Sequence, residues 1–287
     1  MEGPTLWGLA IAFAILFTVF RALELFRSRD RRLPIFRKGF LTDGAYWLFT
    51  PFVTKAITRI CVAGVAIPFA FIVYGKFDRE LILQGFGPAS RLPLWVQAVG
   101  ILAVGDFIGY WMHRAFHGRR LWRFHAVHHS SVDLDWLSAV RVHPVNDAVM
   151  RVAGTLPVLA LGFAPVAVAG IVPVLTLMAI LVHANLDWDW GPFRAVIASP
   201  RFHRWHHTDE EQARDKNFAG LLPLWDILFG TYYMPKEERP SRFGTMTPVP
   251  TGLIGQVVFP FRRQASAVRS QSTAGERPQA AALHHQA

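Results

Sequence analysis

Three histidine clusters on either side of an apolar segment constrain this chain more than any other feature. They read His113-Arg-Ala-Phe-His117, His125-Ala-Val-His128-His129 and His203-Arg-Trp-His206-His207, and they hold eight of the twelve histidines. Residues 148–182, between the second and third clusters, are almost uncharged after Arg151 and long enough to enter a membrane and return. The fold must therefore bring the third cluster back to the side of the first two.

The composition indicates an integral membrane protein. Hydrophobic residues make up 52% of the chain and charged residues 17%, and soluble domains carry about 25% charged residues. The net charge is +10, but the basic residues flank apolar runs, so we attribute them to membrane orientation and lipid headgroups and expect no nucleic-acid partner. The single cysteine, Cys61, allows neither an internal disulfide nor a thiolate metal site.

We expect an all-α integral membrane helical bundle of four to five apolar segments with a cytosolic histidine-rich helical cap. The apolar segments are about residues 6–26, residues 45–75 with a span centred on Ile60–Tyr74, Leu92–Met112, and a tilted or re-entrant hairpin over 148–182. Lys55 and Arg59 should reach the membrane interface at the start of the second segment.

The charge pattern predicts the orientation of these segments. Arginines follow the first segment and favour the cytoplasmic side, and the chain returns to that side before the first histidine cluster. All clusters should then lie on the cytoplasmic face, with a cytosolic cap from Asp187 to about Phe261. Residues 1–261 form one membrane-embedded domain in this interpretation, and residues 262–287 form a disordered tail without a role for His284 or His285.

Helical spacing explains how these clusters can bind metal. Positions i, i+3 and i+4 share one helix face, whereas adjacent histidines diverge by about 100° around the axis. One member of each adjacent pair can therefore serve one metal while its neighbour serves a second. Imidazole suits iron, copper, zinc and nickel, and the clusters fit neither the HExxH pattern nor the two-histidine, one-carboxylate set. Haem ligation and a histidine-rich metal buffer are the alternatives.

The residues that flank the clusters resemble those of one known family. That family is the fatty acid hydroxylase/sterol desaturase superfamily of integral membrane di-iron enzymes, and the resemblance covers roughly residues 40–235. Besides the three clusters it rests on Gly105–Arg114, Arg141-Val-His143-Pro144, His183-Ala-Asn-Leu186, Ser199–His203 and Trp225–Tyr232.

The resemblance implies a function and a cofactor. Two iron ions, replaceable by zinc in purified material, would support dioxygen-dependent hydroxylation or desaturation of an unactivated C–H position in a lipid that enters from the bilayer. No catalytic residue is expected apart from the metal ligands. Electrons would come from an external donor, a ferredoxin or a b-type cytochrome with its reductase. His183 matches the extra histidine of the family, which gives nine expected ligands: His113, His117, His125, His128, His129, His183, His203, His206 and His207.

Three carboxylates are further candidates. Asp187 is either a weak metal ligand, an acceptor for a ligand, or solvated. Asp106 lies seven residues before His113, so we expect it to orient an imidazole N–H, with an ion pair to Arg59 as the alternative. Asp226 either supports a ligand or caps a turn.

His143 precedes Pro144 and therefore either lines the site or forms a structural turn. The alternative function for the whole chain is a non-catalytic membrane metal- or haem-binding protein, either a metal transporter or a b-type cytochrome. A transporter would place its ligands along a path through the membrane midplane, whereas these clusters are expected at one surface.

Overall fold

All regular structure in the described residues, 4–27 and 33–262 of this computed structural model, is helical. Apart from helices and loops, the described part contains one isolated antiparallel bridge, between Thr208 and Phe243. The predicted all-α class is confirmed. The predicted disordered tail lies outside the described residues from residue 263 onward, and so do His284 and His285.

Three helical stretches are long and apolar enough to cross a membrane. They are Leu6–Phe26 within α1 (Leu6–Arg27), Phe40–Tyr74, and Leu94–Phe116, which is α6. The predicted segments 6–26, 45–75 and 92–112 agree with these stretches to within a few residues. The protein is therefore a membrane protein.

The second stretch is a continuous rod built from α2 (Phe40–Phe49), a π-helical turn (Thr50–Thr54) and α3 (Lys55–Tyr74). Pro51 lies in the π-helical turn, which fits its missing N–H group and the clash of its ring with the preceding turn. At the start of α3, Lys55 Nζ forms an ion pair with Asp147 at 2.9 Å, so this ammonium contacts a neighbouring helix rather than only the membrane interface.

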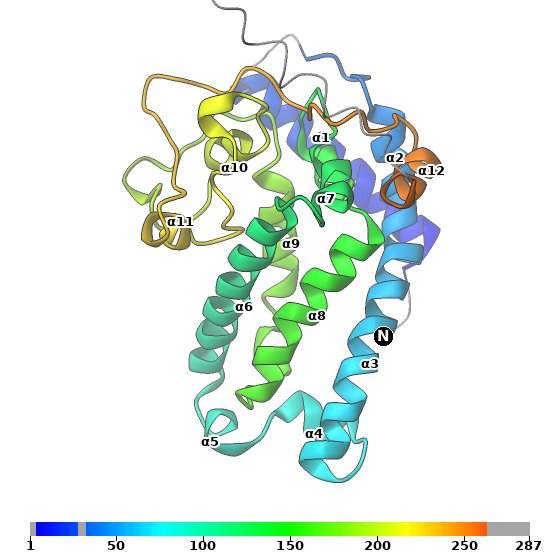
Figure 1. The fold of residues 1–287 in the computed structure, drawn as a ribbon, viewed down its shortest axis with the longest axis vertical. Helices are drawn as coiled ribbons and strands as arrows, with labels where there is room; N and C mark the ends of the chain where they lie inside the picture. The colour runs from blue at the N-terminus through cyan, green and yellow to red at the C-terminus, as the bar shows by residue number, and fades with distance from the viewer. Residues whose placement is uncertain (1–3, 28–32, 263–287) are drawn as a thin grey trace, which may run out of the picture.

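Residues 148–182 form a helical hairpin, as expected. Its arms are α8 (Pro144–Ala160) and α9 (Val172–Leu181), and α8 packs between α3 and α6 (Figure 1). Gly162, with φ of +78°, lets the turn meet the chain before α6, because a Cβ there would lie 2.2 Å from the Phe86 carbonyl oxygen. The arms have 17 and 10 residues, below the roughly 20 needed for a full crossing. The total of four to five segments therefore stays a prediction.

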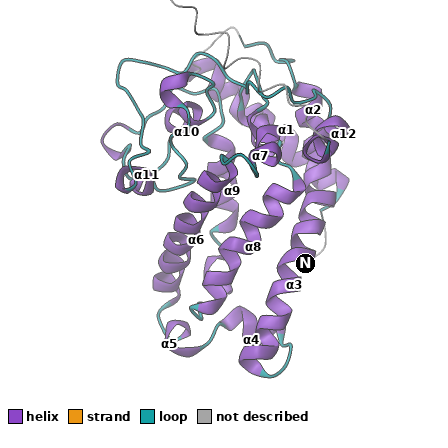
Figure 2. Ribbon diagram, in the orientation of Figure 1, coloured by secondary structure: helices purple, strands orange, loops and turns teal. Residues whose placement is uncertain are grey.

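The helices that carry the histidine clusters meet at one end of the bundle (Figures 1 and 2). At this end lie the last turn of α6, α7 (Trp122–His129), α10 (Pro200–His206), α11 (Leu224–Leu228) and α12 (Leu253–Val258). At the opposite end lie α4 (Arg79–Gln84) and α5 (Gly87–Ser90).

Buried aromatic residues hold α10 against α6. Phe202 and Trp205 of α10 are 0% exposed and share a core with Tyr110 of α6 and Phe218. Ser199 caps α10 by accepting the N–H of Phe202 at 3.1 Å. This packing brings the third histidine cluster onto the first.

Candidate metal centre

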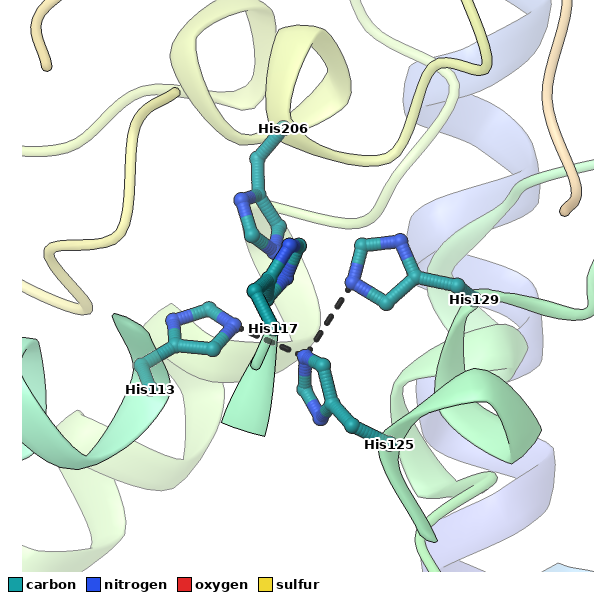
Figure 3. Close-up of side chains that lie close together, drawn as sticks. All are labelled: His113, His117, His125, His129 and His206. Carbon is teal, nitrogen blue, oxygen red and sulfur yellow. Dashed lines mark hydrogen bonds between the residues drawn. The ribbon is translucent and has the colours of Figure 1, made fainter. Parts of the chain in front are cut away.

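Nine histidines gather into two adjacent groups, and within each group the ligand nitrogens lie within 4.8 Å of one another. The five-histidine group (Figure 3) consists of His113, His117, His125, His129 and His206. The four-histidine group consists of His128, His183, His203 and His207. These are the nine histidines singled out from the sequence, and either group could hold a metal ion.

The HxxHH spacing divides each cluster between the two groups. His125 and His129, one helical turn apart, belong to the five-histidine group, whereas His128 belongs to the four-histidine group. The third cluster divides in the opposite sense. The groups touch, because the ring centroids of His129 and His207 lie 4.4 Å apart. The divergence of adjacent histidines expected from helical geometry is therefore present in both clusters.

Oxygen acceptors hold the outer nitrogen, Nδ1, of six ligands. In the five-histidine group the acceptors are the Phe218 carbonyl for His113 (2.7 Å), Asp215 Oδ1 for His117 (3.0 Å), Asn146 Oδ1 for His125 (2.9 Å) and the Lys216 carbonyl for His206 (2.9 Å). In the four-histidine group they are the Arg141 carbonyl for His128 (3.1 Å) and the Ala179 carbonyl for His183 (2.7 Å). A carbonyl only accepts hydrogen bonds, so these contacts place the ring proton on Nδ1.

The inner nitrogens, Nε2, are thereby left as lone-pair donors that face one another. His113 and His125 bring their Nε2 atoms to 2.9 Å, and His128 and His183 bring theirs to 3.2 Å. Two neutral imidazoles with both ring protons on Nδ1 cannot share a hydrogen bond through Nε2. A cation between them resolves the contact, because nitrogens bound at about 2.0–2.1 Å to one metal lie roughly 3 Å apart.

Two further nitrogens point to the same conclusion. His117 Nε2 and His206 Nε2 are buried and have no hydrogen-bond partner, and both belong to the five-histidine group. Figure 3 shows the rings of this group converging on a common space. Buried polar atoms without partners are rare in folded proteins, so these atoms fit metal ligands.

Burial keeps the imidazoles in the neutral form that binds metal. It lowers the pKa values of His125, His129 and His206 in one group and of His128 and His207 in the other well below their usual range, and neighbouring imidazoles lower them further. The same two causes lower the pKa of His203. At neutral pH the six rings therefore offer lone pairs rather than positive charges.

The segment 215–218 holds three ligands of the five-histidine group. It supplies the acceptors for His117, His206 and His113, and its backbone is unusual because Asp215 and Asn217 have φ of +55° and +57°. Asn217 fixes the segment by donating to the Phe202 carbonyl at 2.9 Å. The signal for this segment in the sequence is weak, namely that Asp and Asn tolerate positive φ better than most residues.

A buried ion-pair network supports the four-histidine group. Arg141, whose carbonyl holds His128, donates from Nε to Asp43 at 2.6 Å, and Arg37 donates to the other oxygen of Asp43 at 2.7 Å. Arg37 also pairs with Asp135, the N-cap of the 3-10 helix Trp136–Val140. The Arg141–Asp43 and Arg37–Asp135 pairs each join residues 98 positions apart in sequence, and no local pattern predicted them.

Asp106 and Asp187 have hydrogen-bond partners outside the two histidine groups. Asp106 does not hold an imidazole; its oxygens accept the N–H groups of Leu221 and Leu222 at 2.9 Å and Trp225 Nε1 at 3.0 Å, so it anchors the segment after residue 218. Asp187 accepts from Arg201 Nε at 2.8 Å and from Arg239 Nε at 2.9 Å. It lies in a loop six residues after α9 ends and outside both histidine groups.

Asp226 and His143 each form hydrogen bonds with backbone groups rather than with the nine histidines. Asp226 is 0% exposed and accepts the N–H groups of Phe218 and Ala219, both at 2.8 Å, so it fixes the peptide whose carbonyl holds His113. It therefore supports a ligand indirectly. His143 caps α8 by accepting the N–H of Val145 at 3.1 Å. Within the described residues it forms no hydrogen bond with any histidine of the two groups.

The part of the chain that contains the two histidine groups is similar to known proteins. Residues 98–231 match the fatty acid hydroxylase family, a range that contains all nine histidines. An ornithine lipid hydroxylase of Rhizobium tropici is 33% identical over 177 residues, which are 61% of this chain and 53% of that protein. An alkylglycerol monooxygenase of Danio rerio is 32% identical over 166 residues, or 58% of this chain and 35% of that protein.

A more distant relative is a very-long-chain aldehyde decarbonylase of Oryza sativa, 28% identical over 175 residues, which are 54% of this chain and 27% of that protein. This chain thus spans about half or less of the length of these curated relatives. No solved structure is detectably similar.

Proposed function

We propose that the chain is a member of the fatty acid hydroxylase/sterol desaturase superfamily, to whose fatty acid hydroxylase family residues 98–231 are similar, and that it is a membrane-bound oxygenase that oxidises an unactivated C–H position of a lipid. The observation that carries the proposal is the pair of adjacent all-imidazole groups. Two Nε2 atoms lie 2.9 Å apart within the five-histidine group, and two lie 3.2 Å apart within the four-histidine group. Such a ligand set has no evident use in packing alone, because each buried imidazole must be desolvated.

The proposed cofactor is a pair of iron ions, one in each histidine group, and zinc can replace them in purified material. When bound, the two irons would supply the site at which dioxygen is activated and would relay to it the electrons received from an external donor. The chain itself keeps the ligand rings neutral and orients them through their Nδ1 contacts. The oxygen acceptors raise the basicity of the imidazoles and fix their tautomer.

The proposed substrate is a lipid that reaches the centre from the bilayer, and hydroxylation is the proposed outcome, with desaturation as the alternative. Two of the relatives are named for ornithine lipid hydroxylation and for monooxygenation of alkylglycerols. Both names describe lipids with a polar headgroup. Electrons come from an external donor, either a ferredoxin or a b-type cytochrome with its reductase.

The proposed orientation places both histidine groups on the cytoplasmic side. Arg119, Arg120 and Arg123 are exposed and follow directly after α6, and Lys38 directly precedes α2. Basic residues next to membrane helices favour the cytoplasmic face. Residues 1–261 act as one domain in this proposal, and the cap from Asp187 to Phe261 lies in the cytoplasm.

Comparative lipid mass spectrometry under labelled dioxygen tests the function. Membranes that contain the protein should accumulate a lipid that has gained one labelled oxygen atom, and membranes with a His203→Ala variant should not. Loss of two hydrogens instead would show desaturation. An unchanged lipid profile in the presence of a competent electron donor would contradict the proposal and favour a metal-binding or haem-binding protein.

A further inference from the structure

A cavity of about 730 Å³ lies beside the second histidine cluster and is lined by none of the nine histidines. One wall is residues 36–42, which lead into α2. A second wall consists of residue 245 and residues 247–251, together with Gln256 of α12. The third wall consists of Ser130, Val132 and Arg141. Because the cavity is separate from the proposed metal centre, it needs its own explanation.

Gln256 presents an unsatisfied acceptor in this cavity wall. The side chain is 1% exposed, and its Nε2 atom donates to the Pro250 carbonyl at 2.8 Å. Its Oε1 atom is buried and has no hydrogen-bond partner. This oxygen is enclosed within the wall, out of reach of a group in the cavity, so it does not identify a ligand.

The charged residues that line the cavity are all cationic. They are Arg37, Lys38 and Arg141, and no carboxylate is among the lining residues, all of which are described. Both arginines are already paired with Asp43, whereas the exposed side chain of Lys38 forms no ion pair within the described part of the chain. Lys38 is therefore available to an anionic group at the cavity mouth.

Exposed apolar side chains place the mouth at the surface of a bilayer. Phe36 and Leu41 line the cavity and are 78% and 83% exposed. Phe40, which lies between them in the sequence, is the first residue of a stretch long enough to cross a membrane. Cations and aromatic rings at the end of a membrane helix lie at the level of lipid headgroups. A lipid thus fits this mouth better than a soluble anion does.

We propose that the cavity binds the negatively charged headgroup of a lipid, and that the substrate belongs to this class. The inference about the substrate rests on the proposed function. The cavity shares a wall with the metal centre, since Ser130 directly follows His129 and the Arg141 carbonyl accepts the Nδ1–H of His128 at 3.1 Å. A lipid anchored here has its headgroup beside the two histidine groups.

Native mass spectrometry of the metal-free, detergent-purified chain tests the headgroup site. The protein is offered equal amounts of phosphatidylglycerol, which is anionic and has hydroxyl donors, and phosphatidylcholine, which has the same phosphate but no net charge and no donor. We expect roughly tenfold preferential retention of phosphatidylglycerol, as for one charge-assisted hydrogen bond. Lys38→Glu and the cavity-filling Val132→Trp should abolish the preference.

Arg79→Glu is the matched control, because it makes the same charge change on an exposed residue of α4 at the opposite end of the bundle. Equal retention of both lipids by the wild type, or a preference that survives Lys38→Glu and Val132→Trp, would overturn the proposal. Displacement of the lipid by an equal concentration of glycerol 3-phosphate would also overturn it, since the site would then serve a soluble phosphate.

The metal-free measurement separates this inference from the proposed function. A lost preference in Lys38→Glu supports the headgroup site even if no lipid oxidation is found, in which case the proposed function alone fails. Conversely, lipid oxidation by a chain without headgroup preference contradicts only the headgroup site.

Discussion

The five-histidine group and the four-histidine group draw on the same clusters but are held in different ways. Three rings of the five-histidine group depend on the single segment 215–218, and Asp215 has a side chain that is 63% exposed. The four-histidine group is buried throughout and relies on the carbonyls of Arg141 and Ala179. An acceptor of the five-histidine group is thus exposed to solvent, whereas the acceptors of the four-histidine group are carbonyls inside the bundle.

Removal of one histidine from each group should give the largest difference in lipid oxidation between the two groups. His183→Ala leaves three imidazoles in its group, and His117→Ala leaves four in the other. We expect His183→Ala to reduce lipid oxidation by at least about 100-fold and His117→Ala by roughly tenfold, around the range known for ligand-supporting residues. Product quantification by mass spectrometry checks the ranking, and equal losses would show that the two groups are equivalent.

Removal of one supporting carboxylate from each group should affect stability unequally. Asp43→Asn leaves the buried Arg37 and Arg141 short of negative charge and should cost about 3–5 kcal/mol. Asp226→Asn weakens two backbone hydrogen bonds near His113 and should cost about 1–3 kcal/mol. Denaturation midpoints in detergent measure both, with the exposed Glu80→Gln as control. A larger loss of stability in Asp226→Asn than in Asp43→Asn would contradict the view that the four-histidine group depends more on the interior of the bundle.

The exposed edge of the five-histidine group should respond more weakly. Asp215→Asn removes the carboxylate that accepts from His117 and should weaken metal binding about tenfold, with little change in stability. Competition with a chelator measures the affinity. Asp187→Asn is the matched control: its oxygens contact Arg201 and Arg239, so its metal affinity should equal that of the wild type. Weakened binding in the control would restore Asp187 as a ligand.

Acidic pH should lower the stability of the metal-free protein through both histidine groups alike, and this should be the smallest of the expected effects. Burial and neighbouring imidazoles lower the folded-state pKa values of His129 and His207 below the unfolded value of about 6.5. The unfolded chain therefore binds more protons below pH 6.5, and the metal-free protein should lose stability as the pH falls from about 7 towards 5. Thermal unfolding at several pH values checks this slope. A stability that rises on acidification would contradict the neutral-imidazole centre.

Much of the fold and the ligand set was predictable because it has a local signal. Apolar runs of about 20 residues mark α1, the α2–α3 rod and α6, and the spacing of His125, His128 and His129 predicts which rings share a face. The oxygen acceptors were not predictable in the same way. Main-chain carbonyls such as those of Phe218 and Ala179 carry no residue-type signal, and the Asp43–Arg141 pair joins residues 98 positions apart.

Two carboxylates show the limit of this local signal. Asp187 lies four residues after His183, but the two residues would share a helix face only if the helix continued, and it ends at Leu181. Asp106 shares a face with His113, yet the chain after residue 218 supplies it with three closer donors. Periodicity identifies which residues share a face, but tertiary packing decides which partner each one meets.

The metal content of the detergent-purified chain tests the central claim most directly. The two histidine groups predict two iron ions per chain, no haem absorption band, and fewer metal ions in both His128→Ala and His206→Ala, since one residue belongs to each group. A single metal ion per chain, a haem band, or the full metal content in both variants would contradict a two-metal centre.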